Sequence, residues 1–393
     1  MPIDFDQVID RSRTNSMKWS RPEALLTPEE CAAGPLPMWV ADMDFKSPDA
    51  VLEALGEAVR QGVFGYPAGP TRGYVEAVTG WQGRRFGWEV APEWLVLVPG
   101  VVTALKAVIQ AFTGPGDTVL VQPPVYHHFH QDPLLLGRQV AWAPLERHGD
   151  RYRFDPDTFA KAIRPDTRLF ILSNPHNPTG NVWSEDELRA MGETCFRHGI
   201  PVVSDEVHQD LVIDPRRRHV PFASLGPAFA ANSVTCAAAS KTFNLAGLQC
   251  ANLFIPDRER REAMRRQIER NFNARVNLLG MVATEAAYRH GEPWLAALLD
   301  YLRGNQRHFA ATLQAATGKI KVMAMDSLFL AWLDCRALGM EPEALHHFLL
   351  TQGRVWLDPG PKFGPEGHGF MRANLGCPRK LVDEALARLK AVL

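Results

Sequence analysis

Two residues of this 393-residue chain are suited to covalent and acid–base chemistry. Lys241 follows an apolar run and is framed by the small residues Ser240 and Thr242. Burial would lower its pKa and make the amine a nucleophile. Asp205 also follows an apolar run, and a buried carboxylate needs a cation or several hydrogen-bond donors. Taken alone, a surface lysine and a helix-capping aspartate remain open as interpretations.

Two further segments offer hydrogen-bond donors. Residues 99–102 (PGVV) open a predicted helix, where free backbone N–H groups and the positive end of the helix dipole favour a phosphate. Residues 173–180 (SNPHNPTG) contain two Asn-Pro pairs, which impose turn or extended backbone and would present the side-chain amide of Asn177. An ordinary strand-to-helix turn and a merely rigid loop remain open as alternatives.

All four segments follow predicted strands. Seven short apolar runs read as strands: 94–98, 118–121, 140–143, 169–172, 201–203, 234–238 and 251–255. Helical patterns such as 101–112 and 185–197 lie between several of them. This alternation predicts an α/β fold with a mostly parallel seven-stranded sheet flanked by helices. Ligands bind beyond the carboxyl ends of such strands. A lysine, a carboxylate, an amide and a phosphate cradle together suit pyridoxal 5′-phosphate (PLP).

The rest of the chain predicts a smaller α/β domain. Helical patterns cover 258–271, 277–289, 294–316, 342–352 and 380–392, and strand candidates cover 319–325, 328–333, 355–357 and 370–375. The first residues show little periodicity and must pack on another element. We therefore expect a large PLP-binding domain over 47–290, and a small domain built from 1–46 and 291–393.

Eight segments match one enzyme family in order along nearly the whole chain. They are WVADMDF (39–45), FGYP (64–67), PGVV (99–102), PPVYHHF (123–129), NPHNPTG (174–180), SDEVHQD (204–210), SKTFNLAGLQ (240–249) and MRANLGCP (371–378). With these segments the chain resembles fold-type-I PLP-dependent enzymes of the aspartate aminotransferase superfamily. It is most similar to the MalY/PatB branch of cystathionine β-lyase-like C–S lyases.

The resemblance implies a role for each matching residue. Lys241 would bind PLP as an imine, Asp205 would pair with the pyridine nitrogen, and Asn177 would bind the phenolic oxygen. The other implied contacts are Val101, Val102 and Ser240 at the phosphate, Tyr126 on the ring face, His208 where many aminotransferases have tyrosine, Tyr66 reaching the phosphate from the partner subunit, Arg372 at the substrate carboxylate, and Trp39, Ala41 and Asp42 bordering the substrate. Tyr66 and Tyr126 are also candidates for assisting proton transfer. Two positions depart from many relatives: Ala238 stands where they have serine, and Gln249 where they have arginine.

The implied reaction is α,β-elimination from L-cystathionine or a related L-cysteine thioether, which gives pyruvate, ammonia and a thiol. Lys241 would act as the general base. The nearest alternative is a class I/II aminotransferase, which uses the same lysine. A regulatory binding protein that keeps the fold is a third interpretation, which the complete residue set disfavours. The implied assembly is a homodimer with composite active sites.

Charge and composition limit the partners and the compartment. The 43 basic and 44 acidic residues give a net charge of -1 with no basic stripe, which argues against nucleic-acid binding. No apolar stretch reaches the length of a membrane span, and the start lacks signal-peptide features. The six scattered cysteines form no CxxC pair, so neither a metal site nor a disulfide framework is predicted. We therefore expect a cytoplasmic protein.

Overall fold

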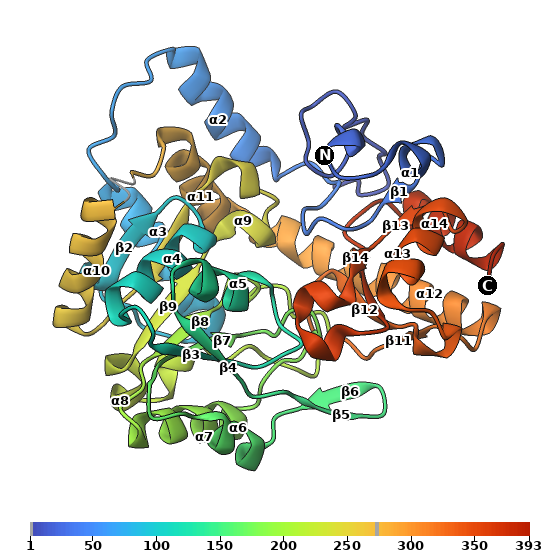
Figure 1. Cartoon of the computed structure of the whole chain (residues 1–393). Coiled ribbons are helices and arrows are strands. Elements are labelled where there is room, and N and C mark those ends of the chain that lie inside the picture. The colour runs from blue at the N-terminus through green and yellow to red at the C-terminus, as the bar shows by residue number, and fades with distance from the viewer. Residues whose placement is uncertain (1–2, 272–274) are drawn as a thin grey trace.

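A seven-stranded sheet forms the centre of the computed structural model, which describes residues 3–271 and 275–393 (Figure 1). The sheet has the order β2-β10-β9-β8-β7-β3-β4. Its strands are β2 (Leu95–Val98), β3 (Thr118–Val121), β4 (Gln139–Trp142), β7 (Thr167–Ser173), β8 (Val202–Asp205), β9 (Ser233–Ala237) and β10 (Ala251–Phe254). Only β10 runs antiparallel to its neighbours within this sheet. The predicted mostly parallel seven-stranded sheet is confirmed.

Helices cover both faces of this sheet. Successive side chains along a strand point to opposite faces, so an apolar strand needs a packing partner on each side. Val119 and Val121 belong to a buried cluster with α4 (Val101–Phe112), α5 (His128–Leu135) and α10 (Arg258–Asn271). The intervening Leu120 packs in a second cluster with α6 (Pro156–Ala162), α7 (Glu185–Arg197) and α8 (Pro227–Ala231). The outer strands β2 and β10 also pack against α3 (Arg72–Phe86) and α11 (Leu278–His290), with α2 (Asp49–Gln61) beyond them.

A smaller sheet of order β11-β12-β15-β14 lies in the C-terminal part of the chain. Its strands are β11 (Lys321–Val322), β12 (Leu330–Asp334), β14 (Asp358–Pro359) and β15 (Phe370–Asn374). Around it lie α12 (Glu292–Ala316), α13 (Pro342–Thr351) and α14 (Arg379–Lys390), and a hairpin of β5 (Glu146–His148) and β6 (Arg151–Arg153) projects from the chain between β4 and α6. The predicted strand 319–325 is reduced to β11, because this edge strand pairs with β12 through two residues only.

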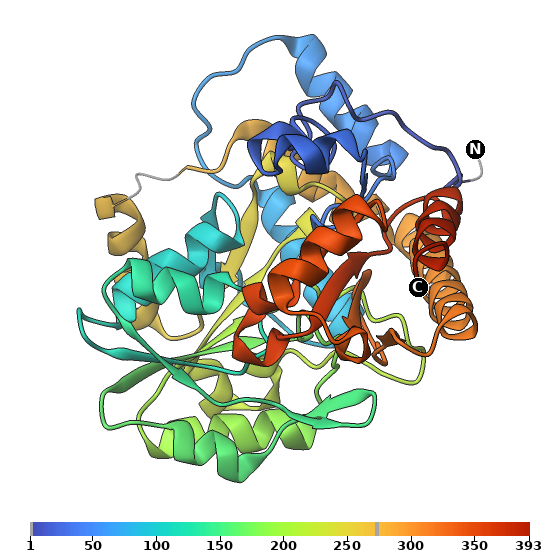
Figure 2. The ribbon, with the colours of Figure 1, turned by 45° about the vertical axis from the view of Figure 1, so that its right-hand side comes forward.

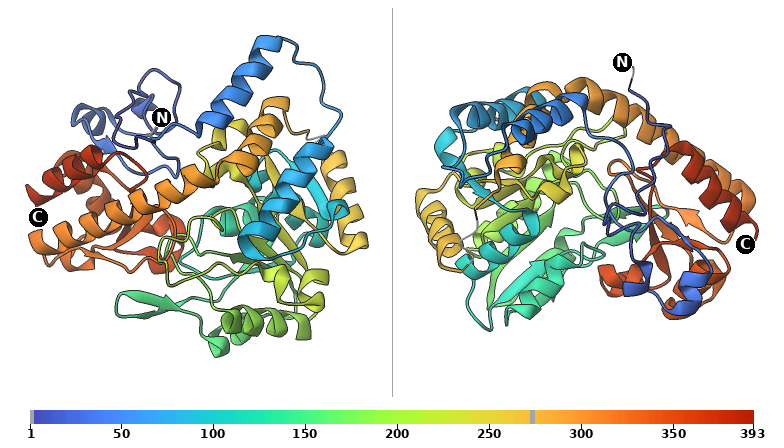
Figure 3. Two further views of the ribbon diagram at one scale, coloured as in Figure 1. Left: turned by 180° about the vertical axis from the view of Figure 1, so that it is seen from behind. Right: turned by 90° about the horizontal axis from the view of Figure 1, so that it is seen from above.

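The N-terminal chain packs beside this smaller sheet (Figure 2). Its α1 (Pro28–Ala32) contacts α13, and β1 (Leu36–Pro37) pairs in parallel with β13 (Val355–Trp356). The long helix α12 runs from α11 to the C-terminal part (Figure 3). The domain bounds 47–290 and 1–46 with 291–393 stay a prediction, and residues 1–2 lie outside the described ranges. None of the helices described here is long and apolar enough to cross a membrane.

Candidate active site

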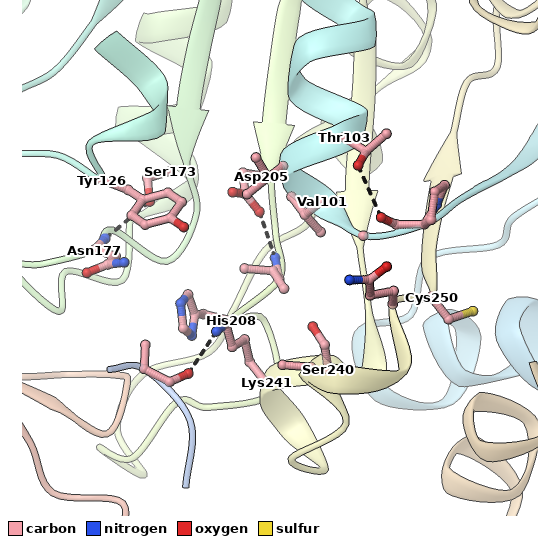
Figure 4. Close-up of a pocket in the computed structure, with 17 residues that line it drawn as sticks. Val101, Thr103, Tyr126, Ser173, Asn177, Asp205, His208, Ser240, Lys241 and Cys250 are labelled. Atoms are coloured by element: carbon pink, nitrogen blue, oxygen red, sulfur yellow. Dashed lines mark hydrogen bonds between the residues drawn. The ribbon is translucent and has the colours of Figure 1, made fainter. Parts of the chain in front are cut away.

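A cavity of about 300 Å³ opens where the carboxyl ends of the parallel strands meet the N-terminal chain (Figure 4). Nine residues predicted for the site line it: Ala41, Val101, Val102, Tyr126, Asn177, Asp205, His208, Ser240 and Lys241. Four others are not among its lining residues: Trp39, Asp42, Tyr66 and Arg372. The topology thus gathers residues that are far apart along the chain, such as Ala41 and Lys241, which are separated by 200 positions.

The N-terminus of α4 forms one end of the cavity. Strand β2 ends at Val98, and Gly100 turns the chain with a φ of 94°, a conformation that favours glycine. No side chain caps this helix, so the first N–H groups, including those of Val101 and Val102, face the cavity without a side-chain acceptor. Ser240 and Gln249 line the same cavity. Free N–H groups and hydroxyl and amide donors suit a phosphate.

Asp205 ends β8 and supplies the negative charge of the cavity. Its Oδ1 accepts a hydrogen bond from the Val207 N–H at 3.2 Å, and it forms no ion pair with any residue of the described ranges. Burial, with a smaller contribution from the adjacent Glu206, raises the pKa of Asp205 to about 7, although the Val207 hydrogen bond and Lys241 oppose the shift. A cation beside this buried carboxylate, such as a protonated ring nitrogen, would stabilise its charged form.

Lys241 lies in the short helix α9 (Ala239–Thr242), directly after β9. Its Nζ donates to the Ala41 carbonyl at 2.7 Å, which is the dashed contact drawn from Lys241 in Figure 4. Burial lowers the pKa of Lys241 to about 8, and the nearby Asp42 carboxylate opposes this shift. The neutral amine is therefore accessible near physiological pH, as a nucleophile or a base requires.

Tyr126, Asn177 and His208 line the cavity from three separate segments. The Asn177 N–H donates to Ser173 Oγ at 3.1 Å, and its Oδ1 accepts from Arg372, so its side-chain NH₂ is the group left for a ligand. Burial raises the pKa of the Tyr126 hydroxyl and lowers that of His208 well below its ordinary value. His208 is therefore neutral, and its buried Nδ1 has no partner within the described residues.

Arg372 lies beside the cavity on β15 and is held by several acceptors. Its Nη2 donates to Asp358 Oδ2 at 2.6 Å and to the Trp39 carbonyl at 3.1 Å, and its Nη1 donates to Asn177 Oδ1 at 3.2 Å. Lys362 contacts the other Asp358 oxygen at 3.0 Å. The buried Nε of Arg372 has no partner among the residues described. Both terminal nitrogens of the guanidinium thus have acceptors, and Nε is the donor left for an incoming carboxylate.

The N-terminal residues predicted to border the substrate have different placements. The Trp39 ring stacks on Trp356, with ring centroids 4.6 Å apart, so the backbone of Trp39 rather than its ring contacts Arg372. Ala41 lines the cavity. Asp42 forms an ion pair with Arg11 at 2.6 Å.

Tyr66 lies on the loop between α2 and α3, which stands away from the rest of the chain (Figure 1). Its side chain is 97% exposed, so one chain alone does not bring Tyr66 to the cavity. Val63 and Phe64 on the same loop are also largely exposed, at 70% and 59%.

The donor set of the cavity fits PLP. The uncapped N–H groups of α4 can donate to a phosphate. Asp205 has no ion-pair partner among the described residues, where the Ala41 carbonyl is the hydrogen-bond partner of Lys241 Nζ. The unpartnered Nδ1 of His208 adds a polar atom that a bound group can satisfy. No group of side chains suited to a metal ion occurs in the ranges 3–271 and 275–393.

Sequence reasoning missed Asp358, which contacts Arg372. It follows the expected strand 355–357 and forms the two-residue strand β14, which is too short to give a periodic signal. It also missed Asn374, although this residue lies two positions after the predicted Arg372. The carboxamide of Asn374 bonds the backbone around Ala41, and only the three-dimensional arrangement reveals that contact.

Comparison with known proteins gives a consistent result. Residues 38–389 match the family described as aminotransferase class I and II. Cystathionine β-lyase PatB of Bacillus subtilis is 44% identical over 392 residues, which cover 100% of both chains.

Solved structures agree over the same length. A PLP-bound aminotransferase candidate from Clostridium difficile superposes with a TM-score of 0.95 at 37% identity and covers 99% of each chain. Cystalysin from Treponema denticola, which contains PLP, superposes with a TM-score of 0.94 at 30% identity, covering 100% of this chain and 98% of that one.

Proposed function

This chain belongs to the aminotransferase class I and II family, and on that premise we propose that it is a PLP-dependent C–S β-lyase acting on L-cystathionine or related L-cysteine thioethers. The observation that carries the proposal is the cavity, which joins Lys241, Asp205 and the α4 N-terminus in a chain similar to a cystathionine β-lyase along its whole length. When bound, PLP supplies an electron sink for the electron pair that is left at Cα of the substrate.

The residues of the chain divide the work of binding and proton transfer. The α4 N–H groups would bind the phosphate, and Asp205 would hold a proton at the ring nitrogen. Arg372 would orient the substrate carboxylate, and the Asn177 amide would donate to the phenolic oxygen. Tyr126, which lines the same cavity, would contact the ring.

Lys241 takes the Cα proton as general base. The Cβ–S bond then breaks, and its electron pair leaves with sulfur as a thiolate, which takes up a proton. The released enamine adds water to give pyruvate and ammonia. Burial lowers the pKa of Lys241 to about 8, so a larger fraction of the amine is neutral near physiological pH than for an exposed lysine, and the neutral amine can take the proton.

We further propose a homodimer. The supporting observation is the exposed apolar surface of α2 and its following loop, with Val59, Val63 and Phe64 more than half exposed beside Tyr66. A second copy of the chain would cover this surface and bring Tyr66 to the partner's phosphate site. The predicted location is the cytoplasm, with which the six free cysteine thiols are consistent.

An aminotransferase is the second candidate, because the superposed Clostridium difficile protein is described as one. The experiment that separates the two omits keto acid. Purified PLP-loaded protein is incubated with L-cystathionine, and pyruvate and thiol are measured over time. A lyase turns over continuously, whereas an aminotransferase stops when its cofactor is left as the amine. A Lys241→Ala variant is the control for base-dependent chemistry.

A further inference from the structure

One backbone segment, residues 38–45, connects the two halves of the active site; we call it the bridging segment. Five successive carbonyls of this segment accept hydrogen bonds from residues at or next to the catalytic positions. The contacts are Met38 O with the Asn374 N–H (2.8 Å), Trp39 O with Arg372 Nη2 (3.1 Å), Val40 O with Asn374 Nδ2, Ala41 O with Lys241 Nζ (2.7 Å), and Asp42 O with Asn374 Nδ2 (2.6 Å). The segment is thus tied to both Arg372 and Lys241.

Asn374 anchors the bridging segment from the smaller sheet. It lies on β15 two residues after Arg372 and is fully buried. Its Nδ2 bonds the carbonyls on either side of Ala41, and its Oδ1 accepts from the Gly376 N–H at 2.7 Å. The carboxamide is therefore fully engaged in backbone contacts. Between the two carbonyls that it holds, the Ala41 carbonyl points to Lys241.

Asn244 anchors the same segment from the turn that follows α9, three residues after Lys241. Its Oδ1 accepts from the Met43 N–H at 3.0 Å, and its Nδ2 donates to the Met43 and Phe45 carbonyls, each at 2.9 Å. Its backbone has a φ of 59°, a left-handed conformation that asparagine tolerates better than most residues. Each catalytic residue is thus followed closely by an asparagine that holds the bridging segment.

We propose that Asn374 and Asn244 are positioning residues, which act through the bridging segment to hold the Ala41 carbonyl as the acceptor of the Lys241 ammonium group. The inference rests on the proposed function in one respect, that Lys241 is the base. A buried ammonium group needs a hydrogen-bond acceptor. Because Lys241 becomes an ammonium group each time it takes a proton, it needs such an acceptor in every turnover. The contact itself belongs to the chain, so it can be tested without turnover.

The charged and titratable groups that face Lys241 are Asp42, Arg372, Asp205 and His208. Asp42 and Asp205 favour the ammonium form, Arg372 disfavours it, and His208 stays neutral. Removing the Asn374 side chain deletes none of these four groups; it loosens the Ala41 carbonyl together with Asp42, which lies in the same segment and also favours the ammonium form. Because an acceptor stabilises the charged amine, its loss lowers the pKa of Lys241.

The test uses cofactor-free protein. Competitive acetylation of the lysines at a series of pH values, read by peptide mass spectrometry, gives the midpoint at which Lys241 becomes reactive. Two variants weaken the bridging segment from opposite sides: Asn374→Ala, and Asn244→Gly, in which glycine accepts the positive φ without strain. The expected result is a lower Lys241 midpoint in both variants. In the PLP-loaded enzyme, losing two hydrogen bonds to the bridging segment in Asn374→Ala, or three in Asn244→Gly, should lower kcat/KM roughly ten- to a hundred-fold.

Asn305→Ala is the matched control. Asn305 is equally buried, and its Nδ2 also bonds two carbonyls, those of Leu375 (3.0 Å) and Cys377 (2.8 Å), but it does not contact the bridging segment. In Asn305→Ala, the pH midpoint at which Lys241 becomes reactive should equal that of the wild type. An unchanged or raised midpoint in Asn374→Ala, or an equal shift in Asn305→Ala, would overturn the proposal. If Asn374→Ala does not fold, Asn244→Gly decides alone. A failure of the lyase assignment would leave these cofactor-free measurements unchanged, so the two failures are distinguishable.

Discussion

Replacing Asp205 by asparagine should change how the stability of the cofactor-free protein depends on pH. Asp205 is buried at the end of β8 without a cationic partner in the described chain, and its pKa rises from 3.8 to about 7. A folded-state pKa above the unfolded value means that the folded protein binds this proton more tightly. This carboxyl group therefore lowers the free energy of unfolding as pH rises from about 4 to about 7, and its cost stays constant above that.

The magnitude follows from linkage. Raising the pKa of one carboxyl group from 3.8 to about 7 corresponds to about 4 kcal/mol at high pH, of which about 2.5 kcal/mol develops between pH 5 and pH 8. Burial also lowers the pKa of His208 and brings that of His176 to about 4, which gives an opposite slope below pH 6.5. Both histidines are present in wild type and variant, so the difference between the two proteins isolates Asp205.

The assay is urea unfolding of cofactor-free wild type and Asp205→Asn at pH 5 and pH 8. We expect the variant to gain about 2.5 kcal/mol relative to wild type between the two pH values. Adding PLP should remove this gain, because a protonated ring nitrogen pairs with the carboxylate and favours its charged form. A stability difference that is constant between pH 5 and pH 8, or that shifts in favour of the wild type, would refute the reasoning.

Three further predictions concern the other parts of the site. Borohydride treatment of PLP-loaded protein should fix the cofactor on Lys241; a fixed label on another lysine, found by peptide mapping, would contradict the assignment. Arg372→Lys should lose roughly ten- to a hundred-fold in kcat/KM, since a single ammonium group replaces a planar fork, whereas an amine substrate lacking the carboxylate should be almost unaffected; equal losses on both substrates would make Arg372 structural. Mixing inactive Lys241→Ala with a weakly active Tyr66→Ala variant should restore activity through heterodimers that contain one intact site, and a monomer with full activity would exclude composite sites.

The large sheet was predictable because its strands are short buried runs. The predicted strand 118–121 and the helix 101–112 coincide with β3 and α4, and the other strands of the sheet agree to within a few residues. The hairpin β5–β6 escaped prediction because its residues are mostly polar and exposed. The helices α2 and α3 were not predicted either, and both lie outside the strand-and-helix alternation that guided the analysis.

Some residues of the active site were likewise predictable from the sequence, and others were not. Lys241, Asp205 and Asn177 follow strands, so the topology of a parallel sheet brings their positions together, and the sequence alone indicates a common site. The contact of Asp358 with Arg372 depends instead on the pairing of the short strand β14 with β15, and that of Asn374 with Val40 depends on how the smaller sheet meets the N-terminal chain. Short polar segments carry no periodicity that would indicate such contacts.

The measurement that tests the central claim most directly is the number of pyruvate molecules formed per subunit from L-cystathionine without added keto acid. Elimination by Lys241 requires that this number rise far above one and that thiol form in equal amount, because each turnover breaks one Cβ–S bond. The cofactor should keep its initial absorbance throughout. If the protein instead formed no pyruvate and no thiol, but only the sulfur-containing keto acid of cystathionine up to about one per subunit, with the cofactor converted to the amine form, the lyase account would be contradicted.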